Sequence, residues 1–315
     1  MNGQSTVLRL GATARGLYML LRWLPVLSWS VSAFAVAVGF AANALGLGRI
    51  HWFHVLLILG AGVLFQGFTA HAFNDWEDWR SGTDRLSPGI LSGGTKVIPR
   101  GVFTLQALIW IGTATLLMGL GIGIYFVTVS GPLIWLFIAT GIWAAVGYTM
   151  PPLRLAYRPF LGEWAAAWPA MVACTAGAYY ILTGALTWPV LLAGAIQATF
   201  CVGWLMQHHL PDIEADLLAS PPKVTTVALI RRRWGVKKTR WAAAAYFAAA
   251  GLMGLAGGLA GEPVFLASTL LSVPGAGLAL RTDPSSVRDI TGKQLAMMGL
   301  TIVHAVLLAV LVNFV

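Results

Sequence analysis

Long apolar segments separated by short polar connections dominate the chain. Each segment is about 20 residues long and carries few charges, which suits a helix that crosses the hydrocarbon core of a membrane. The segments are residues 17–46, 52–73, 102–126, 131–150, 161–184, 188–209, 241–261, 263–280 and 295–313. The pattern predicts an all-α integral membrane protein with nine transmembrane helices and one domain over residues 1–315. The first segment is overlong, so we expect it to tilt or to extend beyond the membrane.

Lysine and arginine residues fall almost entirely on one side of the predicted membrane. With nine spans, only Arg49 of the 20 basic residues lies on the opposite side. Positive charge marks the inner side of membrane proteins, so the sequence predicts the cytoplasmic membrane, with the N-terminus inside and the C-terminus outside. Hydrophobic residues make up 58% of the chain and charged residues 10%. Topology and an anionic ligand explain the net charge of +9, and no nucleic-acid partner is predicted.

Acidic residues are scarce, and most of them occupy two short windows, which follow spans two and six. Seven of the 11 Asp and Glu residues lie there. Asp75 and Asp78 are spaced i,i+3 and Asp212 and Asp216 i,i+4, so each pair shares a helix face. If spans two and six face each other, four carboxylates converge and their repulsion requires a cation. Mg2+ prefers one or two carboxylates plus substrate phosphates, which predicts a Mg2+-bound diphosphate. A solvated helix end would explain either window alone.

Other polar residues near the predicted inner face are candidate partners for such a substrate. The candidate diphosphate-binding residues are Arg22, Arg80, Lys96, Arg154, Arg158 and Lys223. Arg22 stands out because an arginine inside the start of a span is costly to place in lipid. The candidate bases or acceptor-binding residues are His71, His208, His209 and Glu163. Helix packing is the competing explanation for the histidines, and an ion pair with Arg158 is the competing explanation for Glu163. Pro211 should kink or end span six just before Asp212.

The two acidic windows resemble the paired motifs of the UbiA-type intramembrane prenyltransferase superfamily, usually written NDxxDxxxD and DxxxD. The window after span six matches the second motif. The first motif gives Asn74, Asp75 and Asp78, but Gly82 stands at its last position and the acid falls at Asp84. The resemblance extends over nearly the whole chain.

Further stretches are similar to the dihydroxynaphthoate prenyltransferase branch of menaquinone synthesis. They are the displaced acid of the first motif, the run Tyr148–Arg158, the following Leu161–Glu163 and the region of Arg22. The chain departs from that branch after the second motif. Leu217 stands where a basic residue is common, and Ser220–Lys223 stands where a Gly-Lys pair is common.

The resemblance implies a nine-helix bundle around a central cavity that opens to the inner face and laterally to lipid. It also implies that Mg2+ neutralises the leaving diphosphate, that an allylic cation forms, and that an aromatic, quinone-precursor-like acceptor captures it. The implied partners are therefore a prenyl diphosphate, a hydrophobic aromatic acceptor and membrane lipid. The implied metal ligands are Asn74, Asp75, Asp78, Asp84, Asp212 and Asp216.

Two alternative functions remain open at this point. A membrane terpene cyclase of the same superfamily would ionise the same substrate without an acceptor, because a double bond of the prenyl chain would capture the cation. A cation-coupled secondary transporter would hold its acids near the bilayer midplane, whereas the acids of this chain lie at the predicted inner rim.

Overall fold

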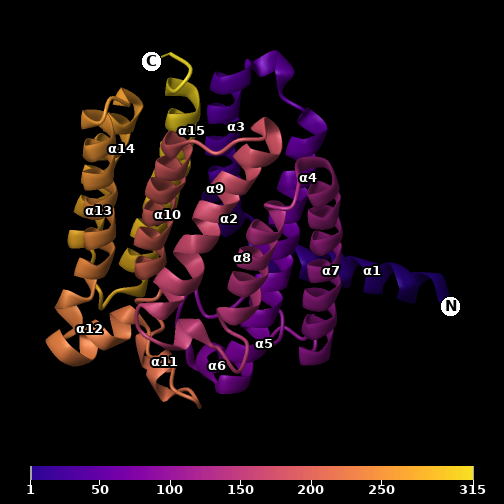
Figure 1. Ribbon diagram of the computed structural model, residues 1–315. Helices are drawn as coiled ribbons and strands as arrows, with labels where there is room; N and C mark the ends of the chain where they lie inside the picture. Colours follow the sequence, from indigo (N-terminus) through magenta and orange to yellow (C-terminus); the bar gives the residue numbers. More distant parts are fainter. Residues whose placement is uncertain (1, 315) are drawn as a thin grey trace.

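The computed structural model describes residues 2–314, with side chains from Gly11 onward apart from Ala12. Within this range the chain forms helices and no β-strand, so the predicted all-α fold is confirmed. Most helices stand side by side in one bundle, while α1 (Asn2–Leu21) projects sideways near its lower end (Figure 1).

Eight helical segments of the described chain are long and apolar enough to cross a membrane. These segments are built from α2 (Trp23–Val26), η1 (Leu27–Val31) and α3 (Ser32–Leu45); α4 (Trp52–Gly62), η3 (Val63–Ala70) and α5 (His71–Ser81); α7 (Leu105–Ser130); η5 (Gly162–Ala167) and α9 (Trp168–Thr183); α10 (Trp188–His208); η6 (Val236–Lys238) and α13 (Arg240–Leu259); η7 (Pro263–Phe265) and α14 (Leu266–Leu280); and α15 (Val287–Leu311). The short elements between them include η2 (Leu47–Arg49), α6 (Thr83–Leu86), η4 (Leu155–Tyr157), α11 (Ile213–Leu218) and α12 (Thr226–Trp234).

The predicted span over residues 131–150 is shorter than the others. It corresponds to α8 (Ile134–Gly147), which has 14 residues. A helix of that length extends about 21 Å, less than the ~30 Å of a hydrocarbon core. Helix α8 nevertheless stands in the bundle beside α7 and α9 (Figure 1).

Three predicted span boundaries differ clearly from the structure. The second spanning segment continues to Ser81 rather than ending at residue 73. Arg22 has φ 46° and ψ 58°, a left-handed conformation that interrupts a right-handed helix, so the first spanning segment begins at Trp23 rather than at residue 17. The last spanning helix begins at Val287 rather than at residue 295. The Ser286 hydroxyl accepts a hydrogen bond from the N–H of Asp289 and caps this early start.

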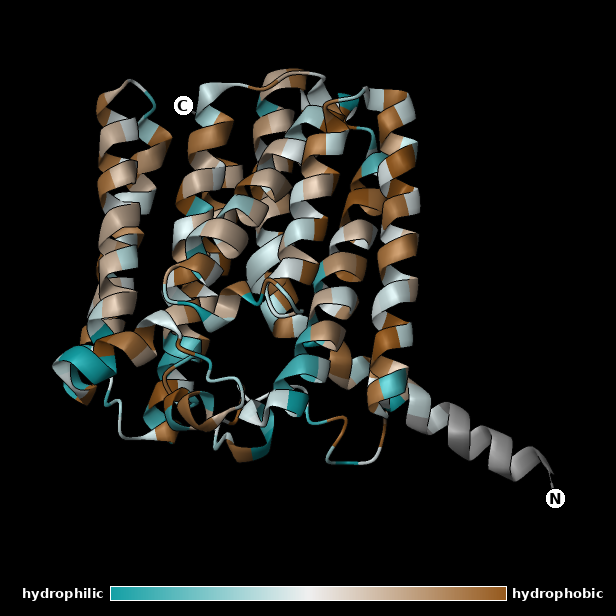
Figure 2. Cartoon of the chain, turned by 60° about the horizontal axis from the view of Figure 1, so that its bottom comes forward, coloured by the Kyte–Doolittle hydropathy of each residue, from teal (hydrophilic) through white to brown (hydrophobic). Residues whose placement is uncertain are grey.

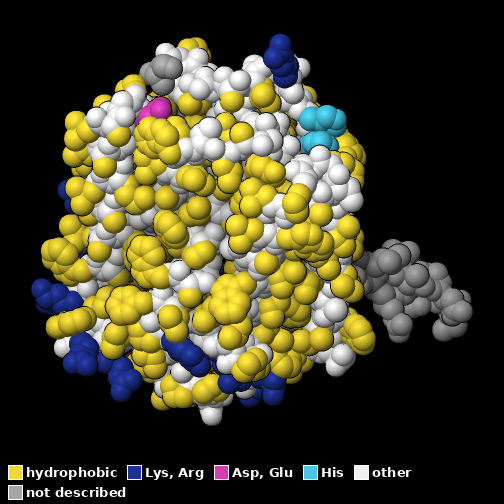
Figure 3. Space-filling view, viewed as in Figure 1, with side chains coloured by type: hydrophobic (Ala, Val, Ile, Leu, Met, Phe, Trp, Pro, Cys, Tyr) yellow, Lys and Arg dark blue, Asp and Glu magenta, His cyan; other side chains and the backbone are white. Residues whose placement is uncertain are grey.

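The distribution of hydropathy along the bundle is that of a membrane protein. Apolar residues predominate along the upright helices, and hydrophilic residues gather in the helices and loops at the lower end (Figure 2). In the space-filling view, Lys and Arg lie mainly at the lower end, beneath a broad apolar surface (Figure 3). Many large apolar side chains of the described chain are strongly exposed, including Leu56 at 66% and Leu270 at 73%. Such an extended apolar surface requires lipid around it.

Close helix contacts in the bundle depend on small residues. A Cβ added at Gly39 of α3 would overlap the backbone of Ala309 in α15. Helices in lipid associate through tight packing rather than through a hydrophobic driving force, so small residues belong at such crossings.

We expect Gly39→Ala to lower the stability of the bundle by about 1–3 kcal/mol, because backbone atoms of Ala309 cannot move aside cheaply. Gly121→Ala is the matched control, since nothing lies within 4 Å of a Cβ at that helical position. Thermal unfolding of both variants in detergent measures the difference. Equal melting temperatures for the two variants would contradict the assigned α3–α15 contact.

Candidate functional site

The two aspartate windows meet at the lower end of the bundle. Lys223 joins them: its Nζ donates to Asp78 Oδ2 at 2.7 Å and lies 4.0 Å from Asp216 Oδ1. Helix α10 ends at His208, and Asp212 follows the turn that contains Pro211, as predicted for this proline. Spans two and six therefore bring their carboxylates together.

Asp78 is the most strongly hydrogen-bonded of the aspartates. It accepts hydrogen bonds from Asn74 Nδ2 at 2.8 Å and from the Tyr157 hydroxyl at 2.7 Å, in addition to the one from Lys223. Burial and the neighbouring Asp78 raise the pKa of Tyr157, so this phenol remains protonated and acts as a donor. Three donors thus fix one carboxylate of the first window.

The loop between α6 and α7 folds across the same site. The backbone N–H of Thr95 donates to both carboxylate oxygens of Asp75 at 3.1–3.2 Å, and the Thr95 hydroxyl donates to one of them. Asp212 accepts from the Ser92 hydroxyl at 2.9 Å and from the Ser87 hydroxyl. Gly94 has φ 74°, and a Cβ there would overlap the Asp84 carboxylate, so the close approach of this loop requires glycine.

The site holds more negative charge than its own cations balance. Burial raises the pKa of Asp84, Asp212 and Asp216, and neighbouring carboxylates raise it further for Asp84 and Asp216. Burial disfavours the Lys223 ammonium, but Asp78 and Asp216 outweigh it and raise the pKa of Lys223. Both carboxylate oxygens of Asp216 are buried without a hydrogen-bond partner in the described chain. A buried carboxylate whose oxygens accept no hydrogen bond is suited to binding a cation.

The oxygen donors of this cluster fit Mg2+. Among the described residues, no group of three His, Cys, Asp or Glu side chains is arranged to hold a metal ion without help. Mg2+ commonly takes only one or two protein carboxylates and completes its octahedral shell with water and substrate phosphates. The orphaned Asp216 oxygens and the carboxylate-only donor set therefore suit a Mg2+ ion that a phosphate group also binds.

A cavity of about 320 Å³ extends from the aspartates into the bundle. Asn74, Asp78, Asp84, Asp212 and Lys223 line its polar end. Its remaining lining is mainly apolar and comes from helices of the bundle, including Phe34, Phe126, Ile134, Phe137 and Met171.

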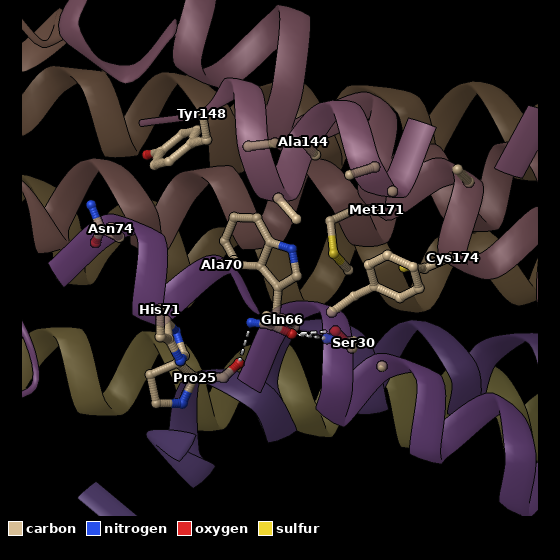
Figure 4. A pocket seen from close by; sticks show the side chains of 18 of the residues that line it. Pro25, Ser30, Gln66, Ala70, His71, Asn74, Ala144, Tyr148, Met171 and Cys174 are labelled. Atoms are coloured by element: carbon tan, nitrogen blue, oxygen red, sulfur yellow. Dashed lines mark hydrogen bonds between the residues drawn. The ribbon is translucent and has the colours of Figure 1, made fainter. Parts of the chain in front are cut away.

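Figure 4 shows part of the lining, in which the Gln66 side chain is hydrogen-bonded to two neighbouring residues. Gln66 accepts from the Ser30 N–H at 3.1 Å and donates to the Pro25 carbonyl at 3.3 Å, so its amide is satisfied within the wall. His71 and Asn74 lie on the same side of the cavity, closer to the aspartates.

The three candidate histidines all line the cavity. His71 Nδ1 lies 3.1 Å from the carbonyl oxygens of both Leu20 and Gly67. His208 Nδ1 lies 3.0 Å from Gln294 Nε2. His209 Nε2 lies 3.4 Å from the Tyr148 hydroxyl, and burial together with the nearby Lys223 lowers the pKa of His209 to about 3, so its ring is neutral.

Glu163 lies apart from the cavity. It is buried with Oε2 lacking a hydrogen-bond partner, and no ion pair joins it to Arg158 in the described chain. The predicted alternative of an Arg158–Glu163 pair is therefore wrong.

The structure separates the six candidate basic residues into two groups. Arg22 and Lys223 line the cavity, and Lys96 lies beside Asp75 and Asp84 in a small adjoining pocket. The other three are elsewhere: Arg154 binds Glu77 at 2.6 Å, Arg80 stacks on Trp76 at 4.3 Å, and Arg158 is exposed.

Sequence reasoning missed the neutral donors of the site. Ser87, Ser92 and Thr95 lie in a run rich in Ser, Gly and Thr, which is the only sequence feature that could have indicated them. Tyr157 falls within the run that supported the resemblance, but nothing in its spacing identifies Asp78 as its partner.

These features define a class of protein: a helical membrane protein that holds a carboxylate cluster at the polar end of a deep apolar cavity. The model of the UbiA prenyltransferase family matches residues 32–291, so the chain belongs to that family and is a prenyltransferase-family enzyme. A search of curated protein sequences finds no significant match.

Solved structures support the fold. A UbiA homolog from Archaeoglobus fulgidus bound to GPP and Mg2+ has a TM-score of 0.60 at 16% identity, with 95% of this chain and 100% of that chain covered. The homolog bound to DMAPP and Mg2+ has a TM-score of 0.62 at 15% identity, covering 92% and 98%. A digeranylgeranylglyceryl phosphate synthase has a TM-score of 0.56 at 12% identity, covering 94% and 99%.

We expect Asp84→Asn to stabilise the metal-free protein. Burial, Asp78 and Asp75 raise the pKa of Asp84 above 3.8, so the folded state binds a proton more tightly than the unfolded chain. Stability should then fall as the pH rises above about 4. In EDTA, the wild type should melt at a higher temperature near pH 5 than near pH 8, and Asp84→Asn should weaken this dependence. Asp283→Asn is the control, because Asp283 lies in an exposed loop. If the melting temperature depended on pH in the same way in all three proteins, the inferred excess of negative charge at the site would be refuted.

Proposed function

We propose that this enzyme ionises a prenyl diphosphate with Mg2+ at the aspartate cluster and transfers the prenyl group to an aromatic, quinone-precursor-like acceptor. The observation that carries the proposal is the meeting of the two aspartate windows at the polar end of an apolar cavity, where the Asp216 oxygens accept no hydrogen bond in the described chain. The homologs bound to GPP or DMAPP with Mg2+ support it, since they share the fold.

The proposed roles follow from position. Mg2+ would supply positive charge that stabilises the leaving diphosphate. Arg22, Lys96 and Lys223 lie near the aspartates and are proposed to bind the diphosphate. Arg80, Arg154 and Arg158 are proposed to serve packing and topology. The proposed metal-binding residues are Asn74, Asp75, Asp78, Asp84, Asp212 and Asp216.

The membrane arrangement is proposed in the same way. Helix α8 would be the ninth span, with the bilayer thinned or its ends extended by the flanking turns. The end rich in Lys and Arg would face the cytoplasm, placing the N-terminus inside and the C-terminus outside (Figure 3). The cavity would open at that end for the diphosphate and acceptor, and laterally for the prenyl chain.

Two competing functions are less well supported. A transporter would need ionisable groups at the middle of the cavity. The hydrogen bond that Figure 4 shows between Gln66 and Ser30 in the cavity wall joins two neutral residues. A terpene cyclase would use the same ionising cluster and differs only in what captures the cation, so the products of the assay below decide between transfer and cyclisation.

Purified enzyme given GPP, Mg2+ and dihydroxynaphthoate should release diphosphate and form a prenylated aromatic. EDTA should abolish release, and Asp75→Asn or Asp212→Asn should lower it by a factor on the order of 100 or more, because each removes a metal-binding charge. Asp283→Asn should behave as wild type. Phosphate assay and mass spectrometry provide the readouts. Undiminished release in EDTA or in both site variants would contradict the metal assignment, and a terpene product without the aromatic would indicate a cyclase.

His71 is proposed as the base that removes the final proton. Carbonyl oxygens only accept hydrogen bonds, so the two carbonyls near Nδ1 require that this nitrogen carries the hydrogen. In the neutral ring the lone pair then lies on Nε2, and the His71 ring lines the cavity. His71 lies one helical turn deeper than Asn74, where the cation would form (Figure 4).

We expect His71→Gln to retain diphosphate release from GPP while the yield of deprotonated product per diphosphate falls by roughly 100-fold. Water should capture the cation instead and give geraniol. His51→Gln, at the opposite end of the bundle, is the control. Release and product yield are measured in the same reaction. A parallel fall of both quantities would show that His71 has only a packing role.

A further inference from the structure

A dense basic surface lies beside the bundle, away from the aspartates. Residues 226–241 contain six Lys and Arg residues and no Asp or Glu. Arg231 pairs with Glu214 of α11, and Lys238 lies over the Trp241 ring at 5.7 Å. Arg232, Arg233 and Lys237 are exposed, and no ion pair in the described chain engages them. We name these three residues, with Trp234 and Trp241, the α12 basic surface.

The two tryptophans place this surface at the membrane boundary. Trp234 is 66% exposed and Trp241 is 52% exposed, and they flank the start of the spanning segment Val236–Leu259. Exposed indoles are typical of the boundary between lipid headgroups and acyl chains. Helix α12 lies at the lower corner of the bundle, where Lys and Arg gather on the molecular surface (Figures 1 and 3).

Membrane sidedness alone does not account for this cluster. The exposed cations Arg281, Arg288 and Arg100 at the same end are not clustered in this way. Arg281 and Arg288 lie in sequence beside Asp283 and Asp289. Arg100 shares its loop with one other cation, Lys96, which lies beside Asp75 and Asp84. The α12 basic surface combines several free cations with two interfacial indoles, which matches an anionic headgroup attached to acyl chains.

The same segment is tied to the candidate site through its backbone. The N–H of Lys223 donates to the Asp216 carbonyl at 2.8 Å, and the N–H of Val224 donates to the Tyr157 carbonyl at 3.1 Å. Thr225 then caps α12 by accepting from the N–H of Ala228. Helix α12 begins at Thr226, three residues after Lys223, which bridges the two aspartate windows. The position of the helix and that of Lys223 are therefore linked.

We propose that the α12 basic surface binds the headgroups of anionic phospholipids, and that this binding holds the segment bearing Lys223 closed against the aspartates. A phospholipid is favoured over free phosphate because phosphate offers nothing to the two indoles. Binding of a lipid headgroup to the α12 basic surface would therefore make the conformation of the segment bearing Lys223 depend on the lipid composition of the inner leaflet.

The test compares two triple variants with the same change in charge. Arg232→Gln/Arg233→Gln/Lys237→Gln alters the surface, and Arg100→Gln/Arg281→Gln/Arg288→Gln alters exposed cations elsewhere at the same end. Native mass spectrometry in detergent measures the binding of phosphatidylglycerol and phosphatidylcholine. The wild type and the control should prefer phosphatidylglycerol, and the α12 triple should bind it on the order of 100-fold more weakly, from about 1 kcal/mol per cation.

Hydrogen exchange tests the link to Lys223 without any substrate. Phosphatidylglycerol in phosphatidylcholine vesicles should slow exchange of the Lys223 and Val224 amides in the wild type and the control but not in the α12 triple. Equal loss of lipid binding in both triples, or no preference for phosphatidylglycerol, would overturn the lipid site. Protection by inorganic phosphate equal to that by the lipid would assign the surface to a free anion instead. Unchanged exchange despite selective lipid binding would overturn the link.

Discussion

Repulsion among buried carboxylates is the constraint around which the lower end of the bundle is organised. Two helices deliver aspartates to one place, and close like charges in a poorly solvated site destabilise each other. One buried ammonium, Lys223, contacts both sides, yet Asp216 keeps two oxygens without a partner. The fold thus tolerates an unbalanced site and relies on packing elsewhere, such as the α3–α15 crossing at Gly39, for its stability.

Neutral donors supplement the three cations, Lys223, Lys96 and Arg22, that lie near the aspartates. Hydroxyl and backbone N–H groups from the loop over residues 87–96 reach Asp75 and Asp212, and they stabilise negative charge without cancelling it. Further lysines in place of these neutral donors would neutralise the cluster and weaken its affinity for a divalent cation. The Ser, Thr and Gly character of this loop follows from that requirement, because Gly94 allows the backbone to pass directly against Asp84.

Hydropathy predicted the bundle because lipid imposes one length and one composition on every span, which the sequence displays directly. It missed the break at Arg22, where a left-handed backbone conformation leaves no trace in hydropathy. The aspartates were predictable because acids are scarce and their helical spacing is fixed. The partners of the basic residues could not be predicted from the sequence. Arg154 could have bound phosphate by its position in the sequence, but tertiary packing pairs it with Glu77. Contacts from a loop, such as that of Ser92, depend on a backbone path that no periodicity encodes.

The two ends of the cavity place opposite demands on a ligand, and together they restrict its chemistry. Carboxylates with Lys223, Lys96 and Arg22 form an end that only a strongly polar, metal-binding group can satisfy. The wall beyond offers Phe34, Phe126 and other apolar groups, and the Gln66 amide on it is already satisfied by Ser30 and Pro25. A small free anion would leave the apolar length unfilled, and an apolar molecule would leave the charges unpaired. An amphiphile with an anionic head and a hydrocarbon tail satisfies both ends at once, and a prenyl diphosphate is such a molecule.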